Sequence, residues 1–235
     1  MTKLEAYDHS RWEFRRRVLR FLIRHIGFNL LVKLDRVEGL DNVPASGPGI
    51  LMINHISFVD PFVVIHVLPR NIVPMAKIEV YDYPVVGIFP RLWNVIPVRR
   101  EEVDRRAVRL ALDVLRAGEM ILMAPEGTRG ESLKEAKGGI AYIASRANAP
   151  VIPVAIEGTI GFPTTPLSPR WKGPGAVVRF GRPFRFITSG KLAGRDALRI
   201  MTDEAMYIMA TMLPEHRRGA YADLSQATTT TIEWL

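Results

Sequence analysis

Residues 49–61 read GILMINHISFVDP, an apolar run that leads directly into polar residues and an Asp-Pro pair. The first five positions show no polar alternation, which is typical of a strand buried on both faces. Asp60 followed by Pro61 is a helix-start pattern, with Asp as the N-cap and Pro at the first helical position. We therefore predict a strand over 49–53, a helix over 61–68 and a short loop between them.

The same alternation of apolar runs and helical patterns continues on both sides of this stretch. Further strands are predicted at 72–75, 95–98, 120–123, 151–156 and 176–180. Further helices are predicted at 101–117, 137–147 and 190–213. Short apolar strands separated by helices indicate an α/β fold, with a mainly parallel central sheet flanked by helices. Ligands of such sheets bind beyond the carboxyl ends of strands, so the residues that follow strands are the candidates for function.

Composition fits one globular domain with terminal extensions. The chain has 235 residues, of which 48% are hydrophobic and 24% charged, so neither a disordered chain nor a fibrous repeat is expected. It has no Cys, which excludes a disulfide scaffold, a cysteine-based zinc or iron–sulfur site and a cysteine nucleophile. We predict an N-terminal basic helical segment over 1–40, a main domain over 41–223 and a C-terminal tail over 224–235.

The net charge of +8 is concentrated near the N-terminus and favours an anionic partner. Residues 1–34 hold eight Lys or Arg and three Asp or Glu. A helix is expected over 11–34, with Glu13, Arg17, Arg20 and Arg24 on one stripe. Apolar residues cover much of the opposite side: Phe14, Val18, Leu19, Phe21, Leu22 and Ile26.

This pattern allows two interpretations of the N-terminal helix. It contacts an anionic bilayer surface as an amphipathic helix, which Trp12 and the three consecutive arginines at 15–17 favour. Alternatively, it packs on its own domain and shows a solvated basic face. No cleavable signal peptide or membrane span is expected, so we predict a peripheral or monotopic protein at the cytoplasmic face of the cell membrane.

His55 follows the first strand, five residues before Asp60. The loop allows the carboxylate to fold back to the imidazole, fix its tautomer and stabilise the imidazolium, which is a general-base dyad. The alternative is that Asp60 only caps the helix and His55 is a loop residue.

A second strand end, after 120–123, reads APEGTRG over 124–130. Gly127 and Gly130 bracket Thr128 and Arg129, which offers backbone N–H groups, a hydroxyl and a guanidinium to a phosphate. Glu126 is expected to orient an arginine or accept a substrate hydroxyl. An ordinary glycine turn is the alternative.

Together these segments resemble the glycerophospholipid acyltransferase family over most of the chain. The Asn-His-x4-Asp motif matches Asn54, His55 and Asp60, and Pro-Glu-Gly-Thr-Arg matches 125–129 without a gap. Residues 94–100 (NVIPVRR) look like the second motif, and 151–154 (VIPV) look like the fourth. Arg99 stands where an acidic residue is common, and Ala124 replaces a usual Phe.

The resemblance implies transfer of a fatty acyl group from acyl-CoA or acyl carrier protein to the sn-2 hydroxyl of 1-acylglycerol 3-phosphate, giving phosphatidic acid. His55 and Asp60 would be catalytic. The substrate would contact Asn54, Lys77, Arg100, Glu126, Gly127, Thr128, Arg129 and Lys137. Neither a cofactor nor a metal is expected. The aromatic-rich segment 81–93 is a candidate wall for an acyl chain, although such a segment is more often ordinary core.

Other functions remain open at this point. The acceptor could instead be glycerol 3-phosphate or a lyso-aminolipid. A catalytically idle peripheral membrane protein is a further alternative, which the intact His55 and Asp60 disfavour. Nucleic-acid binding is disfavoured, because the basic residues lie on one amphipathic segment and no nucleic-acid motif accompanies them.

Overall fold

The computed structural model of the chain describes residues 8, 10–99, 104–188 and 194–235. In these ranges the strands form one mixed sheet, whose path is β1-β7-β6-β2-β5-β3-β4, with β8 beside β6 and β9 beside β8. Pairing is parallel except for β6–β7, β6–β8 and β8–β9. The strands are β1 Leu34–Glu38, β2 Gly49–Ile53, β3 Ile72–Lys77, β4 Ile96–Val98, β5 Met120–Met123, β6 Val151–Glu157, β7 Ala176–Phe180, β8 Phe184–Phe186 and β9 Ile232–Trp234.

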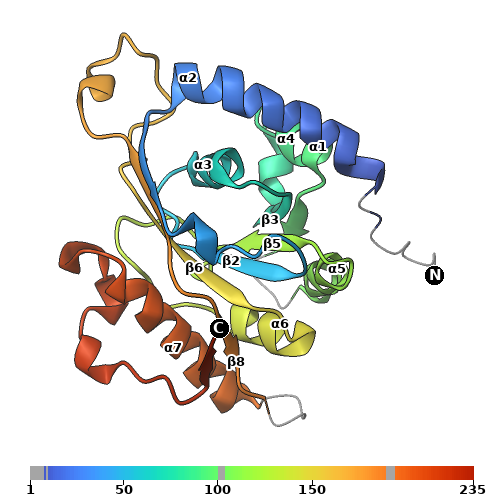
Figure 1. Cartoon of the computed structure of the whole chain (residues 1–235), viewed down its shortest axis with the longest axis vertical. Coiled ribbons are helices and arrows are strands. Elements are labelled where there is room, and N and C mark those ends of the chain that lie inside the picture. Colours follow the sequence, from blue (N-terminus) through green and yellow to red (C-terminus); the bar gives the residue numbers. More distant parts are fainter. Residues whose placement is uncertain (1–7, 9, 100–103, 189–193) are drawn as a thin grey trace.

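Helices cover both faces of this sheet, α1 to α4 on one face and α5 to α7 on the other (Figure 1). They are α1 Ser10–Leu22, α2 Phe28–Leu31, α3 Asp60–Val67, α4 Ile88–Trp93, α5 Arg105–Arg116, α6 Gly139–Ala147 and α7 Arg195–Thr211. A π-helical turn, Ile23–Gly27, joins α1 to α2. Single 3₁₀ turns occupy Leu40–Asn42, Ile78–Asp82, Pro169–Lys172, Glu215–Arg217, Gly219–Tyr221 and Leu224–Gln226. The expected α/β class with a mainly parallel central sheet flanked by helices is therefore confirmed.

Strand β2 lies between β5 and β6, and its side chains supply both hydrophobic cores. Ile50 and Met52 pack into the core under α5, α6 and α7, whereas Leu51 and Ile53 pack into the core under α3. Burial of such side chains contributes about 1.5–3 kcal/mol each. A strand that faces a core on each side has no solvent face, which explains its uninterrupted apolar sequence.

All six predicted strands are present. Three match end to end and the other three have one end shifted by one or two residues, while three further short strands are not predicted. The edge strand β1 reads LDRVE, and its charged residues conceal the apolar pattern. Strands β8 and β9 have three residues each, too few to show a period. Lys77 is the last residue of β3 rather than a residue beyond it.

The start of α3 differs from the predicted helix start. Asp60 is the first helical residue, Val59 occupies the N-cap position, and no side chain makes a capping hydrogen bond. The expectation that Asp60 caps the helix is wrong, because its carboxylate turns back onto the preceding loop instead.

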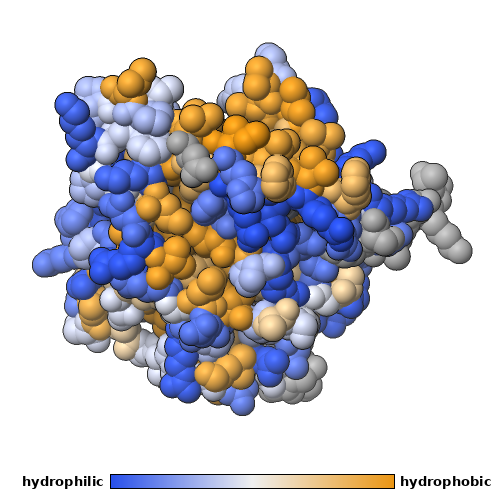
Figure 2. Space-filling view, turned by 45° about the horizontal axis from the view of Figure 1, so that its top comes forward, coloured by the Kyte–Doolittle hydropathy of each residue, from blue (hydrophilic) through white to orange (hydrophobic). Residues whose placement is uncertain are grey.

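The N-terminal helix presents its apolar side outward. Phe14 is 75% exposed and Phe21 59% exposed, whereas Arg16 is fully buried and donates from Nε to the carbonyl of Trp93 at 2.9 Å. The helix thus packs on its own domain, as the second interpretation has it, but the face that it leaves exposed includes apolar rings as well as basic side chains. Contact with a bilayer stays a prediction. Figure 2 turns the side of α1 and α2 toward the viewer and shows a broad apolar area beside a hydrophilic band. None of the described helices combines the length and apolarity that crossing a bilayer requires.

Both expected terminal segments contribute to the same sheet. Strand β1 pairs in parallel with β7, and β9 of the C-terminal segment pairs with β8. The buried carboxylate of Glu204 on α7 accepts hydrogen bonds from Thr228, Thr230 and Thr231. These bonds fix the tail to α7, and the domain limits at 40 and 223 stay a prediction.

Candidate active site

Two loops meet beyond the carboxyl ends of the adjacent parallel strands β2 and β5. The first loop carries His55, and the second is 124–130. The backbone N–H of Gly130 donates to the carbonyl of His55 at 2.9 Å, which ties the two loops together. Gly127 has φ +68°, a conformation that costs other residues energy, and its N–H closes a tight turn on the carbonyl of Ala124.

His55 and Asp60 form the predicted pair. His55 Nδ1 lies 2.9 Å from Asp60 Oδ2, and the imidazole side chain is 17% exposed. The carboxylate fixes Nδ1 as the protonated ring nitrogen, which leaves Nε2 as the nitrogen able to accept a proton. The ring lies on the wall of a cavity, so its free nitrogen can meet a substrate.

Four hydrogen bonds hold the Asp60 carboxylate, which is fully buried behind the imidazole. Oδ2 also accepts from the backbone N–H groups of Ile56 at 2.8 Å and Ser57 at 2.7 Å. Oδ1 accepts from the hydroxyl of Thr159 at 2.6 Å, a residue that follows β6. These donors, together with His55, fix the position of the carboxylate directly behind the imidazole.

Asn54 does not line the cavity. Its buried amide donates to the carbonyl of Ile156 at 3.0 Å and accepts from the N–H of Ile156 at 2.7 Å. The side chain therefore fixes the end of β2 to β6, directly before His55. Sequence spacing could not show this partner, because it lies 102 residues away.

Glu126 is also set back from the cavity wall. Its side chain is 5% exposed, and Oε2 accepts from the backbone N–H of Lys134 at 2.8 Å. Burial raises the pKa of Glu126, while the hydrogen bonds of Lys134 and His55 and their charges oppose the shift. In this position it orders the loop behind Thr128 and Arg129.

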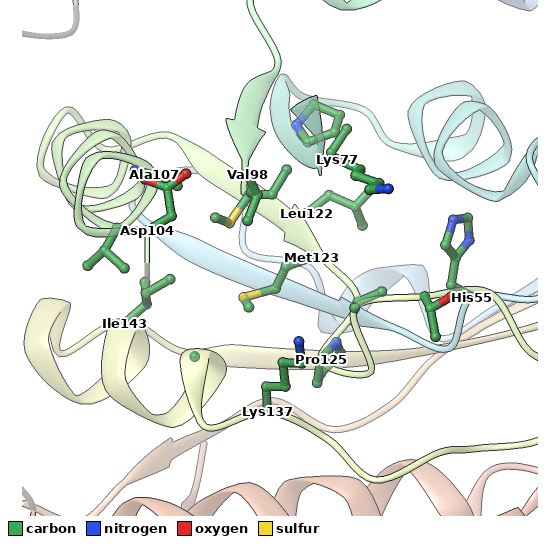
Figure 3. A pocket seen from close by; sticks show the side chains of 18 of the residues that line it. His55, Lys77, Val98, Asp104, Ala107, Leu122, Met123, Pro125, Lys137 and Ile143 are labelled. Carbon is green, nitrogen blue, oxygen red and sulfur yellow. Dashed lines mark hydrogen bonds between the residues drawn. The ribbon is translucent and has the colours of Figure 1, made fainter. Parts of the chain in front are cut away.

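The cavity has a volume of about 1390 Å³ and brings most of the other expected site residues together. Its lining includes His55, Lys77, Gly127, Thr128, Arg129 and Lys137. Figure 3 shows His55 and Lys77 on one side of the cavity and Ile143 on the other, with Leu122 and Met123 between them. Lys77 Nζ lies 3.0 Å from the carboxylate of Glu79. Arg100 falls within 100–103, outside the described residues.

Apolar side chains form much of the remaining wall. Aromatic rings of α3 and α4 are neighbours, with centroids 4.7 Å apart for Phe62 and Phe89. Tyr83 and Phe89 of the aromatic-rich segment line the cavity. Trp93 does not, because it is fully buried and donates from its indole N–H to the carbonyl of Ile72 at 2.8 Å.

A set of arginines that no sequence motif marks also lines this cavity. They project from α5, α6 and α7: Arg105, Arg109, Arg116, Arg146, Arg195 and Arg199. The sequence carries a signal for four of them, because Arg105 and Arg109 are four residues apart, as are Arg195 and Arg199. This spacing puts both arginines of each pair on one face of a predicted helix. Such a cluster attracts an anionic ligand.

No group of three or more His, Asp or Glu residues gathers as metal ligands within the described ranges. The expectation that neither metal nor cofactor takes part stays a prediction.

The chain is similar to known proteins over the segments that form this cavity. The sequence profile of the family described as Acyltransferase matches residues 35–157, more than half of the chain. That range contains His55, Asp60 and the loop 124–130.

Named relatives match about half of the chain. The 1-acyl-sn-glycerol-3-phosphate acyltransferase of Bacillus subtilis is 29% identical over 124 residues, which cover 52% of this chain and 62% of the relative. The enzyme of the same name from Borreliella burgdorferi is 32% identical over 130 residues, covering 54% and 52%. The matched part thus spans about half to three fifths of these relatives.

Among solved structures, the 1-acyl-sn-glycerophosphate acyltransferase of Thermotoga maritima superposes with a TM-score of 0.60 at 23% identity. The match covers 93% of this chain and 84% of that protein. At this identity the likeness concerns the fold.

Proposed function

Because the chain belongs to the Acyltransferase family, we propose that it transfers a fatty acyl group from a thioester donor to the sn-2 hydroxyl of 1-acylglycerol 3-phosphate. The product is phosphatidic acid. The observation that carries the proposal is the His55–Asp60 pair, 2.9 Å apart, on the wall of the cavity that also holds Thr128 and Arg129. The names of the relatives support the choice of acceptor.

His55 acts as the general base. Its Nε2 takes the proton of the acceptor hydroxyl while the hydroxyl oxygen attacks the thioester carbonyl. The tetrahedral intermediate collapses, the C–S bond breaks, and the departing thiolate takes the proton from the imidazolium. Asp60 stabilises that imidazolium, and a base of this kind contributes about 10²- to 10⁴-fold to the rate.

The acceptor phosphate is bound by the loop that follows β5. Arg129 supplies a guanidinium and Thr128 a hydroxyl, and both residues line the cavity. Lys137 and Lys77 line the same cavity and add positive charge. Arg100 belongs to this proposal through its motif alone.

The donor is acyl-CoA or acyl carrier protein, both of which are anionic. Arginines of α5 and α7 on the cavity wall, such as Arg109 and Arg199, supply charge of the opposite sign. The apolar wall formed by Phe58, Phe62 and Phe89 accommodates an aliphatic chain next to His55.

The enzyme works at an anionic bilayer surface, on the cytoplasmic face, because its acceptor is a membrane lipid. Support comes from the outward apolar side of α1, where Phe14 and Phe21 are more than half exposed. Replacing both by Ser should reduce sedimentation with anionic vesicles by at least about tenfold, since each exposed ring contributes more than 1 kcal/mol on burial. An Ile200→Ser protein is the matched control, because this exposed apolar residue lies on α7. Undiminished sedimentation of the double variant would refute the role of α1.

The activity is tested by thiol release from palmitoyl-CoA, and in parallel from palmitoyl acyl carrier protein. The acceptors are 1-oleoylglycerol 3-phosphate, glycerol 3-phosphate, a lyso-aminolipid and none. His55→Ala is compared with His216→Ala, which alters an exposed histidine far from β2 in the sequence.

We expect release that requires the lyso-phosphatidate, persists in His216→Ala and is lost in His55→Ala. Release that requires a different acceptor would replace the proposed substrate. Full activity in His55→Ala would refute the general-base mechanism, and no release with any donor and acceptor would refute the activity.

A further inference from the structure

A second, smaller cavity lies between the N-terminal helix and the residue before β3, away from His55. Its volume is about 260 Å³. Arg17, Arg20 and Phe21 of α1 line it together with Arg24 of the π-helical turn and Asn71. The three arginines belong to the stripe on which Glu13 also lies, and Glu13 and His25 complete the lining.

The hydrogen bonds of these groups leave an excess of positive charge in the cavity. Glu13 pairs with Arg17, with a carboxylate oxygen 2.9 Å from Nη2. Arg24 donates to two neutral backbone carbonyls at the end of α3, those of His66 at 3.1 Å and Leu68 at 2.5 Å. Three guanidinium groups of the lining therefore face one carboxylate of the lining, Glu13, while Glu119 adds a second negative charge near Arg20.

Arg20 differs from its neighbours on this stripe. Its Nε atom is buried, and no acceptor in the described part of the chain reaches it. Burial lowers the pKa of Arg20, and the charges of Arg24 and Arg16 lower it further, whereas Glu119 and Glu13 oppose the shift. A buried guanidinium N–H without an acceptor is costly, and the Arg20 side chain also lines the cavity, where an anion would offset the surplus of positive charge.

The cavity opens beside an apolar surface that suits a lipid. Phe21 lines the cavity and is also 59% exposed, and Val18 on the same side of α1 is 43% exposed. A lipid whose phosphate occupied the cavity would leave its glycerol and acyl chains next to these side chains. Side chains that can bind a phosphate and side chains that can contact acyl chains are thus neighbours on one helix.

We propose that this cavity is a second phosphate-binding site, separate from the catalytic cavity, in which Arg20 and Arg24 bind the phosphate of an anionic phospholipid at the bilayer surface. A guanidinium binds phosphate oxygens in a planar fork that an ammonium group does not reproduce. The site therefore depends on Arg20 as arginine and not only as a positive charge.

The test compares full-length Arg20→Gln, Arg20→Lys and Arg15→Gln proteins with the unchanged chain. Arg15 is the matched control, since it lies on α1, is exposed and does not line the cavity. Binding is measured by sedimentation with phosphatidylcholine vesicles that contain phosphatidic acid, and with phosphatidylcholine alone. A parallel arm titrates inorganic phosphate into each protein by calorimetry, at ionic strength matched with chloride.

We expect Arg20→Gln to weaken binding to the anionic vesicles roughly tenfold and Arg20→Lys to recover only part of it. Arg15→Gln should weaken it less, by no more than the roughly fivefold that one basic residue near an anionic surface contributes through its charge. Phosphate binding that Arg20→Gln abolishes would assign the site to the phosphate group itself. Vesicle binding that depends on Arg20 without phosphate binding would assign it to the lipid. Equal losses in Arg20→Gln and Arg15→Gln, or full binding by Arg20→Lys, would overturn the proposal, because charge alone would then explain the attraction.

Discussion

Replacing Asp60 by Asn tests whether the carboxylate acts through its charge. The backbone N–H groups of Ile56 and Ser57 point at Oδ2, so the amide oxygen of Asn has to take that place. It then still accepts from His55 Nδ1, and the amide NH₂ faces the hydroxyl of Thr159, which can accept a hydrogen bond. The tautomer and orientation of His55 are kept while the negative charge is lost.

The magnitude follows from the loss of one charge-assisted hydrogen bond to the imidazolium. Such a bond contributes about 1.5–3 kcal/mol, which corresponds to roughly a 10- to 150-fold lower kcat. The KM for 1-acylglycerol 3-phosphate should change little, because the fully buried Asp60 does not line the cavity.

The assay is the initial rate of thiol release with lyso-phosphatidate as acceptor, with the thermal midpoint measured alongside. Thr159→Val is the matched control, since it removes one hydrogen bond to Asp60 at Oδ1 but keeps the charge next to His55. It should lower kcat less than Asp60→Asn does. A kcat of Asp60→Asn within about twofold of the unchanged protein would refute the role of the charge.

Three further predictions concern stability and the donor. Asn54→Leu leaves the buried N–H and carbonyl of Ile156 without partners, so urea unfolding should show a loss of about 2–4 kcal/mol; a loss below about 1 kcal/mol would contradict this. Burial, with the charges of Arg24 and His25, lowers the pKa of His66 from 6.5 to about 4. As the pH falls, the unfolded chain therefore takes up this proton first, and the free energy of unfolding drops by about 1–2 kcal/mol between pH 6.5 and 4, a value for a half-buried group. His66→Phe should remove this dependence of unfolding free energy on pH. An unchanged dependence would show that other groups titrate. Arg109→Gln should raise the KM for acyl-CoA several-fold. The KM for acyl-pantetheine, which lacks the nucleotide phosphates, should stay unchanged. Equal changes in the two KM values would show that Arg109 does not bind the donor.

The sequence was informative where local pattern decides structure. The run 49–53 has no polar residue, so a doubly buried strand was the natural prediction. The spacing of His55 and Asp60 placed both in one strand-to-helix loop, where a contact needs no distant partner. Asn54 was different, because its partner Ile156 lies on another strand.

Periodicity separates the faces of a helix without showing which face packs on the domain. In α1 the apolar side faces outward, and the buried position is taken by Arg16, whose partner is a carbonyl of α4. The carbonyl of Trp93 gives the buried guanidinium an acceptor there, which lowers the cost of its burial. This acceptor belongs to a separate segment, which a helical pattern cannot reveal.

The pairing of β1 with β7 has a consequence for the order of assembly during synthesis. Leu34 lies opposite Ala176 in the parallel ladder, so β1 finds its partner only after some 140 further residues have left the ribosome. The preceding helices meet their partners earlier, because Arg24 and Arg16 donate to carbonyls at 66–68 and at 93. The N-terminal helices can therefore be in place before α6 and α7, which line the cavity beside His55, have been synthesised.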